Sequence, residues 1–343
     1  MKHIPLVACA LAVLGASLRA AEPARPADDK KDAAHYNRLL GRGMNLGNAL
    51  EAPREGAWGI RLEEDYFERI KKAGFNSVRI PICWSAHAAA RPPYDIDAAF
   101  FKRVDWAVEQ ALSRDLAAVI NVHHFDDLYR DPDAHEARLL ALWKQIAAHY
   151  RDRSDRLFFE LLNEPNGKLT DERWNAITPK VLEVVRATNP ERVVIVGPGH
   201  WNGLNSLDKL TLPEKDRRLI VTFHYYNPFE FTHQGAEWAR DSQKWKGKTW
   251  TGTPKETEAL AKDFDKAAVW GKKNDRPLFL GEFGAYNVAD MDSRARWTRA
   301  VAREAEKNGF SWAYWEFASG FGAYDPAAKE WREPLLKALL DKE

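Results

Sequence analysis

The sequence is poor in cysteine, in net charge and in long apolar segments, and each shortage excludes a class of protein. Its 343 residues include only two cysteines, Cys9 and Cys83. Lys and Arg together number 51 and Asp and Glu together number 50, a net charge of +1. This balance favours neither a nucleic-acid partner nor an anionic membrane. The apolar run at residues 4–18 is too short and too rich in alanine to be a good membrane span.

That apolar run instead has the pattern of a secretory signal peptide. A charged start at residues 1–3 precedes it and small residues follow it. We expect residues 1–20 to be removed as a signal peptide, residues 21–35 to be a flexible leader, and the mature protein to be secreted or periplasmic, with no membrane contact after cleavage. Residues 6–9 are similar to a lipoprotein cleavage box, but only five residues precede them. Cleavage leaves Cys83 alone, so no intramolecular disulfide can form.

From residue 36 onward, short apolar runs alternate with helical patterns. One such pattern is Phe100, Val104, Val108 and Ala111, which recur at helical spacing. Eight strands separated by helices predict a single-domain (β/α)₈ TIM barrel over residues 36–343, within the α/β class. A doubly wound sheet fits less well, because the sequence contains no Gly-x-Gly-x-x-Gly or Walker motif. The eight predicted strands are residues 41–46, 77–82, 117–123, 157–163, 193–197, 220–225, 278–282 and 311–315.

Polar and aromatic side chains end these runs, where a parallel barrel presents its site. Two of them are glutamates, Glu164 and Glu282. An unpaired buried charge is unfavourable, so a carboxylate at the mouth of a buried strand indicates chemistry. Two converging carboxylates are the minimum set for cleaving a glycosidic bond: one donates a proton to the leaving oxygen, and the other attacks the sugar or activates water. The other residues at these ends are Arg79, His123, His124, His224, Tyr226 and Trp315.

The two glutamates need different environments for this chemistry. The acid must hold its proton near neutral pH while the nucleophile stays ionised. Asn163-Glu164-Pro165 is the most specific motif, because the amide of Asn163 can bond a sugar 2-hydroxyl. The alternative interpretation of this motif is a helix-capping turn. Glu282 is then the natural nucleophile. We expect Arg79 to hold it ionised, a role compatible with a salt bridge inside the barrel.

A metal site is the main competing interpretation of the histidines. His123, His124 and His224 could bind zinc together with a glutamate. The sequence has no His-Glu-x-x-His motif, however, and no aspartate accompanies these histidines at the strand ends. Neutral histidines that hydrogen-bond sugar hydroxyls and carboxylates need fewer assumptions, so we expect no metal and no cofactor. For one of the adjacent residues His123 and His124, a buried structural role is the alternative.

Taken in order, Arg79, His123-His124, Asn163-Glu164-Pro165, His224-x-Tyr226, Glu282 and Trp315 closely resemble the family 5 glycoside hydrolases of clan A. Longer strings at 42–53, 224–238 and 312–317 resemble a subgroup of bacterial endo-β-1,4-glucanases, some of which also cleave β-mannans. The resemblance implies a retaining mechanism, with Glu164 as acid/base and Glu282 as nucleophile, supported by Arg79, Asn163, His224 and Tyr226. It also implies substrate contacts from Asn48, Glu51, His123, His124, Trp201, His233, Trp238 and Trp315.

We therefore expect a secreted, monomeric endo-β-1,4-glucanase acting on cellulose, β-glucan or glucomannan. An endo-β-1,4-mannanase or a dual-specificity enzyme is the nearest alternative, because mannose differs from glucose only at C2. A non-catalytic carbohydrate-binding barrel is opposed by the presence of both glutamates, and a metal-dependent hydrolase is weaker still. The 14 tryptophans fit either a large core or sugar-stacking surfaces. Trp201, in a turn-rich stretch, and Trp238, in the long irregular stretch 227–254, are expected to be exposed at the cleft.

Overall fold

The structure is a computed structural model that describes Met1 and residues 32–341. The predicted signal peptide and most of the predicted leader lie outside the described residues. We placed the start of the barrel at residue 36. Helix α1 (Ala33–Leu40) begins earlier, and the Asp32 carboxylate caps it by accepting from the backbone N–H of His35 at 2.7 Å. Residues 32–35 therefore belong to the folded unit.

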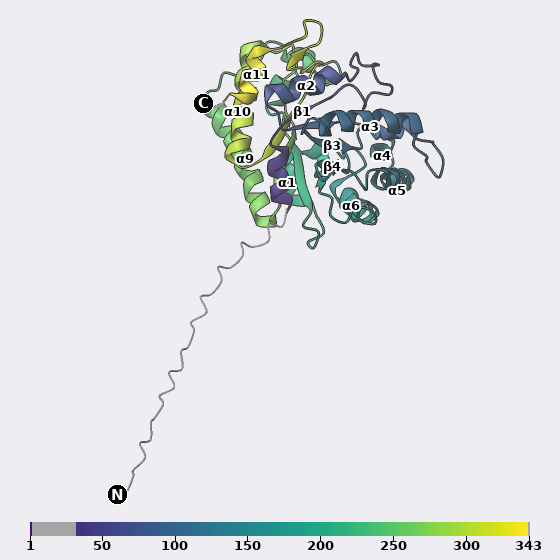
Figure 1. The fold of residues 1–343 in the computed structure, drawn as a ribbon. Coiled ribbons are helices and arrows are strands. Elements are labelled where there is room, and N and C mark those ends of the chain that lie inside the picture. The colour runs from purple at the N-terminus through teal and green to yellow at the C-terminus, as the bar shows by residue number, and fades with distance from the viewer. Residues whose placement is uncertain (2–31, 342–343) are drawn as a thin grey trace. The chain divides into compact units, whose positions relative to one another are not determined.

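Eight parallel strands close into a barrel in chain order, because β1 pairs with both β2 and β8. The (β/α)₈ fold predicted from the sequence is confirmed. Figure 1 shows the helices arranged around the strands. The strands are β1 (Arg42–Asn45), β2 (Ser77–Ile80), β3 (Ala117–Asn121), β4 (Leu157–Glu160), β5 (Val194–Val196), β6 (Leu219–His224), β7 (Leu278–Glu282) and β8 (Ser311–Tyr314).

Long amphipathic helices cover the outside of the barrel, and α9, α10 and α11 lie side by side (Figure 1). A capping box begins α9: Thr253 and Glu256 each bond the backbone N–H of the other. The long helices are α2 (Glu64–Ala73), α3 (Ala98–Leu112), α5 (Pro132–His149), α6 (Asp171–Arg186), α9 (Pro254–Asn274), α10 (Met291–Lys307) and α11 (Glu333–Leu340). Short elements in the loops are η1 (Trp84–His87), α4 (Asp126–Arg130), α7 (Gly199–Asn202), η2 (Leu204–Lys209), α8 (Phe229–Thr232), η3 (Ser242–Trp245), β9 (Tyr324–Asp325) and β10 (Glu330–Trp331).

Helix α1 closes the N-terminal end of the barrel. Its residues Tyr36 and Leu40 join a buried cluster with inward-facing strand residues such as Phe158 and Phe279. Asn37 ties the helix to two strands: its amide donates to the carbonyl of Leu278 at 3.0 Å, and it accepts from Ser311 at 2.7 Å. The C-terminal ends of the strands are left for the site, as in other barrels of this kind.

None of the helices among the described residues combines the length and the apolar composition that a membrane crossing requires.

Candidate active site

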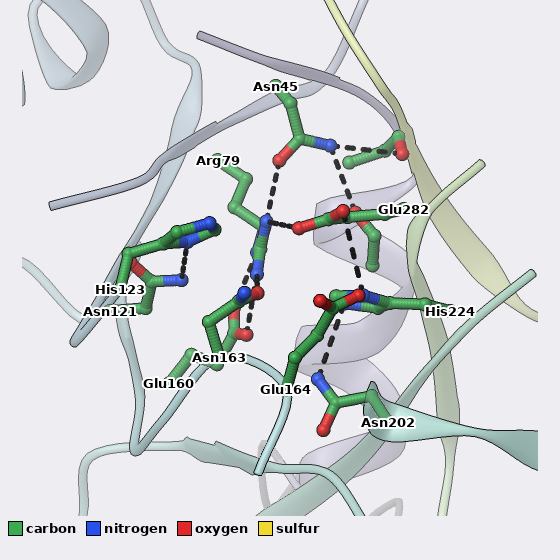
Figure 2. A network of polar contacts seen from close by, with 12 residues as sticks. Asn45, Arg79, Asn121, His123, Glu160, Asn163, Glu164, Asn202, His224 and Glu282 are labelled. Carbon is green, nitrogen blue, oxygen red and sulfur yellow. Dashed lines mark hydrogen bonds and ion pairs between the residues drawn. The ribbon is translucent and has the colours of Figure 1, made fainter. Parts of the chain in front are cut away.

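Arg79, fully buried on β2, organises the centre of the site. Its Nε and Nη2 donate to the two carboxylate oxygens of Glu160 at 2.6 and 2.8 Å. Nη1 donates to Oε1 of Glu282 at 2.7 Å and to Asn45 at 2.9 Å, and Nη2 also donates to Asn163 at 2.7 Å. Figure 2 shows this arrangement. All five N–H donors of the guanidinium are therefore used, and its orientation is fixed.

Glu282, the last residue of β7, lies between a cation and a phenol. Its Oε1 accepts from Arg79, and its Oε2 accepts from the Tyr226 hydroxyl at 2.9 Å. Burial raises the pKa of Glu282, while His224 and Arg79 act in the opposite direction. Arg79 thus favours the ionised form, as expected, but burial is the stronger effect and the net direction is upward.

Glu164 follows β4 with a left-handed backbone (φ 48°), which turns its side chain across the barrel mouth. A quarter of the side chain is exposed (25%). Burial raises the pKa of Glu164 to about 8, with Arg79 opposing and Glu160 adding to the rise. The group is therefore protonated at neutral pH, as a general acid must be. One carboxylate oxygen of Glu164 lies within 4.8 Å of one of Glu282.

His224 joins the two glutamates. Its Nδ1 lies 2.7 Å from Oε1 of Glu164 and 3.6 Å from Oε2 of Glu282. Burial lowers the pKa of His224 to about 4, so the ring is neutral. On the other side, Asn202 Nδ2 lies 3.3 Å from Nε2 and donates to it (Figure 2). Nε2 is then the acceptor and Nδ1 carries the hydrogen, which is donated to Glu164.

Gly281 provides the space that His224 occupies. A Cβ at this position would lie 2.6 Å from Thr222 Oγ1 and 3.0 Å from His224 Nε2. The first distance is closer than real Cβ contacts, so any side chain here would displace the neighbouring β6 side chains. The glycine before Glu282 is therefore required by packing next to the two glutamates.

Within the part of the chain that the structure describes, one group of side chains could hold a metal ion: Glu164, His224 and Glu282. The Arg79 guanidinium already binds Oε1 of Glu282 and repels a second cation at that place. Glu164, whose pKa is about 8, would also have to lose its proton before it could act as a ligand. The geometry favours a hydrogen-bonded acid pair over a metal centre.

His123, His124 and Trp315 line the β3–β8 side of the site. The amide of Asn121 bonds Nδ1 of His123 at 3.0 Å, and the imidazole lies parallel to the Trp315 ring at 5.9 Å. Burial lowers the pKa of His123 well below its usual range, so this ring is also neutral. His124 is exposed beside it, in edge contact with Trp58 at 5.5 Å. Trp58 was not among the predicted site residues.

Trp201 and Trp238 are 55% and 64% exposed, which confirms the predicted exposure of both rings. The backbone N–H of Trp201 donates to the carbonyl of Pro165 at 3.1 Å, so its turn adjoins the acid. His233 is placed differently. It is buried against the Tyr226 ring at 4.9 Å, where it supports the phenol that bonds Glu282.

Asn48 and Glu51 lie in the loop after β1. Glu51 is only 1% exposed and its carboxylate accepts from the backbone N–H groups of Asn48 and Ala49. Burial raises the pKa of Glu51 to about 8. The half-buried Asn48 is more accessible to a sugar. Glu51 would have to leave its backbone partners to make the predicted substrate contact, so here it holds the loop in place.

Sequence reasoning missed several polar residues that build the site. Glu160 stands inside the same apolar run as Glu164, and a charge in such a run requires a buried partner, which is Arg79. Glu316 follows Trp315 and accepts from the backbone N–H groups of Ala318, Ser319 and Phe321. Asn45 and Asn121 end strands and Asn202 lies in a loop, and nothing in the sequence shows which groups their amides bond.

A parallel (β/α)₈ barrel whose strand ends bring together a protonated and an arginine-bound carboxyl group has the arrangement of a glycoside hydrolase. Comparison with known proteins agrees with this class. Residues 37–320 match the family model Cellulase (glycosyl hydrolase family 5), and the chain belongs to this family.

Individual relatives support the same assignment. Endoglucanase H of Acetivibrio thermocellus is 40% identical over 288 residues, which cover 84% of this chain and 30% of that protein's length. The crystal structure of endoglucanase Cel5A from Thermotoga maritima has a TM-score of 0.89 and 53% identity, covering 90% of this chain and 100% of that one. Cel5A in complex with mannotriose matches with the same TM-score of 0.89, 52% identity, and coverage of 90% and 100%.

Proposed function

We propose that this protein is a retaining endo-β-1,4-glucanase that hydrolyses internal bonds of cellulose, β-glucan or glucomannan by double displacement. One observation carries the proposal: two carboxyl groups lie within 4.8 Å of each other in different electrostatic environments. Glu164, with a pKa of about 8, is a proton donor, whereas Glu282 faces the cation of Arg79. An inverting pair, roughly 6.5–9.5 Å apart, would leave room for a water molecule between carboxylate and sugar.

In the first step, Glu164 protonates the glycosidic oxygen while a Glu282 oxygen attacks the anomeric carbon. The bond to the leaving sugar breaks and a glycosyl ester to Glu282 forms. In the second step, the Glu164 carboxylate takes a proton from water, the resulting hydroxide attacks the same carbon, and Glu282 is released. The Nδ1–H of His224 stabilises the Glu164 carboxylate between the two steps.

Exposed aromatic rings on two groups of loops support action on a polymer. The exposed Trp58 and the half-buried Trp315 lie on the β1–β8 side, and the exposed Trp201 and Trp238 follow β5 and β6. The rings offer apolar faces to successive sugar units, and the named endoglucanases among the relatives agree with a glucan substrate.

A β-mannanase activity, alone or as a second specificity, is the other candidate. The mannotriose complex of the related Cel5A favours it. A reducing-sugar assay across barley β-glucan, carboxymethylcellulose, glucomannan, galactomannan and xylan separates the two. Proton NMR of the first-formed anomer tests the mechanism, because an initial α-anomer from a β-linked polymer would contradict retention.

Export to the periplasm or the medium is supported by the pattern of residues 1–20. Mass spectrometry of the mature N-terminus in the native host tests this, and a retained Met1 would exclude cleavage. We also propose that the enzyme acts as a monomer, which light scattering after size-exclusion chromatography tests.

A further inference from the structure

The backbone at Glu164 is held in a conformation that an isolated glutamate avoids. Its φ of 48° lies in the left-handed region, which costs free energy for a residue other than glycine unless the surrounding contacts enforce it. Because peptide groups are planar, the φ and ψ of a residue describe how its two flanking peptide planes are rotated. Contacts that fix both planes therefore fix the direction in which the Glu164 side chain leaves the backbone.

Tyr129, a buried residue of the short helix α4, fixes the peptide plane before Glu164. Its hydroxyl donates to the carbonyl oxygen of Asn163, which belongs to that plane. The backbone N–H of Asn163 donates to the carbonyl of Val122 at 2.8 Å, so Asn163 is tied on both sides. Rotation of the plane before Glu164 would leave a buried hydroxyl and a buried carbonyl without partners, which is unfavourable.

The two peptide planes after Glu164 are fixed in the same way. The side-chain amide of Asn166 donates to the carbonyl of Glu164 at 2.8 Å. The backbone N–H of Trp201 donates to the carbonyl of Pro165 at 3.1 Å. The three consecutive carbonyl groups of residues 163–165 are therefore all hydrogen-bonded, and the acid stands in the middle of this anchored turn.

Tyr129 also binds the far end of the turn. Its own carbonyl accepts from the backbone N–H of Lys168 at 2.9 Å. Gly167 permits this approach: its φ of 63° is left-handed, and a Cβ at this position would lie 2.9 Å from the Tyr129 carbonyl oxygen. One residue of α4 thus bonds the chain both before and after Glu164.

We propose that Tyr129, together with Asn166, is a positioning residue for the general acid, acting on Glu164 through the two peptide planes that flank it. The proposal rests on the proposed function, in which Glu164 is the acid/base. The Tyr129 hydroxyl is already donated to a backbone carbonyl, so it acts through Glu164 and not on the substrate. His224 holds the other end of Glu164, at 2.7 Å, so loss of one backbone anchor should misplace the carboxyl group by less than its complete removal would.

Tyr129→Phe tests this role, because it keeps the ring and removes only the hydroxyl. Phenyl β-cellobioside needs a proton on its leaving oxygen, whereas 2,4-dinitrophenyl β-cellobioside leaves with little proton donation. In Tyr129→Phe, kcat/KM should fall about tenfold on the phenyl substrate and about twofold or less on the dinitrophenyl substrate. A merely destabilised enzyme would lose the same factor on both.

Tyr36→Phe on α1 is the matched control. Tyr36 is buried to a similar extent, and its hydroxyl bonds Asp155 at 2.8 Å at the opposite end of the barrel. Its removal should leave the ratio of the two kcat/KM values unchanged. Asn166→Ala, at a half-buried position, should repeat the selective loss, and it decides the question if Tyr129→Phe melts too early to assay.

Glu164→Ala, measured on the same two substrates, separates failure of this inference from failure of the proposed function. It should lose far more activity on the phenyl than on the dinitrophenyl substrate. If it does, but Tyr129→Phe and Asn166→Ala lose activity equally on both substrates or on neither, the positioning role is overturned. If Glu164→Ala itself shows no such difference, Glu164 is not the acid and the proposed function is wrong.

Discussion

The Nδ1 atom of His224 lies 2.7 Å from Oε1 of Glu164, and this contact makes the two carboxyl oxygens of Glu164 inequivalent. Asn202 donates to the other ring nitrogen, so Nδ1–H points at Oε1. An oxygen that accepts this hydrogen bond is a poor place for a proton. With Nδ1–H as the donor, this hydrogen bond favours the Glu164 proton on Oε2 over Oε1.

The pH dependence of the wild-type enzyme should follow from the two glutamates. Turnover requires Glu164 protonated, so activity falls as pH rises through its pKa of about 8. It also requires Glu282 ionised, and burial raises that pKa, so the acidic limb lies above the usual range of a glutamate. A bell-shaped profile of kcat/KM against pH checks both limits. Undiminished activity well above the pKa of Glu164 would contradict its role as the acid.

Asn202→Asp should move the alkaline limb downward. Aspartate tolerates the left-handed backbone of this position (φ 53°) but accepts a hydrogen bond instead of donating one. His224 would then gain a second proton, and the resulting cation lowers the pKa of Glu164 by about one pH unit. The kcat/KM profile of the variant measures the shift, with an unchanged melting temperature as control. An unmoved limb would show that Asn202 does not set the protonation of His224.

Removal of each glutamate should give a different chemical outcome. Glu282→Ala should lose turnover and regain part of it with azide, which enters the vacated space and yields an α-glycosyl azide. Glu164→Ala should retain activity on substrates with good leaving groups, since these need little proton donation, and should yield the β-azide. NMR of the azide products distinguishes the two. The opposite pattern would reverse the assignment of acid and nucleophile.

Trp201→Ala and Trp238→Ala should raise KM for polymer with little change in stability. Both rings are largely exposed, so truncation removes sugar contacts and not core packing. Trp297, 1% exposed, is the matched control, and its replacement by alanine should reduce stability by about 3–5 kcal/mol. Polymer kinetics and thermal melts on all three variants give the comparison. Early melting with normal polymer binding in the first two would exclude stacking.

Glu160→Gln should destabilise the protein strongly, by about 3–5 kcal/mol, because it leaves the buried guanidinium of Arg79 without its bidentate partner. The control is Glu68→Gln on α2. Glu68 pairs with Lys72 and Arg114 at the surface, where solvent screening leaves an ion pair with little effect on stability. Urea unfolding of both variants measures the difference. Equal effects would mean that the Arg79 pair is not the electrostatic centre of the barrel.

The barrel could be predicted from the sequence because each strand is a short apolar run with a helix after it. Strand ends were predicted less well. The runs at 77–82, 117–123 and 157–163 continue past the observed ends of β2, β3 and β4, at Ile80, Asn121 and Glu160. Apolar composition persists where the chain has left the sheet, since loop residues such as Leu161 and Leu162 still pack into the core.

The site, like the strands, could be predicted only in part. Glu164, Glu282 and Arg79 could be identified because an unpaired charge at a buried strand is unfavourable, so such a residue has a partner or a function. Asn202 could not, because its role depends on a left-handed turn that brings its amide to His224, and one asparagine in a loop does not reveal that geometry. The burial of Glu51 depends in the same way on the folding of its own loop around it.

The saturated guanidinium of Arg79 has one further consequence. Because each of its donors already has a protein acceptor, a sugar can neither compete for this group nor rotate it. The Arg79 network is thus distinct from the exposed tryptophans of the loops. Changes around Trp58, Trp201 or Trp238 can alter which glycan is accepted while the strand ends keep their geometry. Redesign of specificity in this barrel should begin in those loops and leave the strand ends untouched.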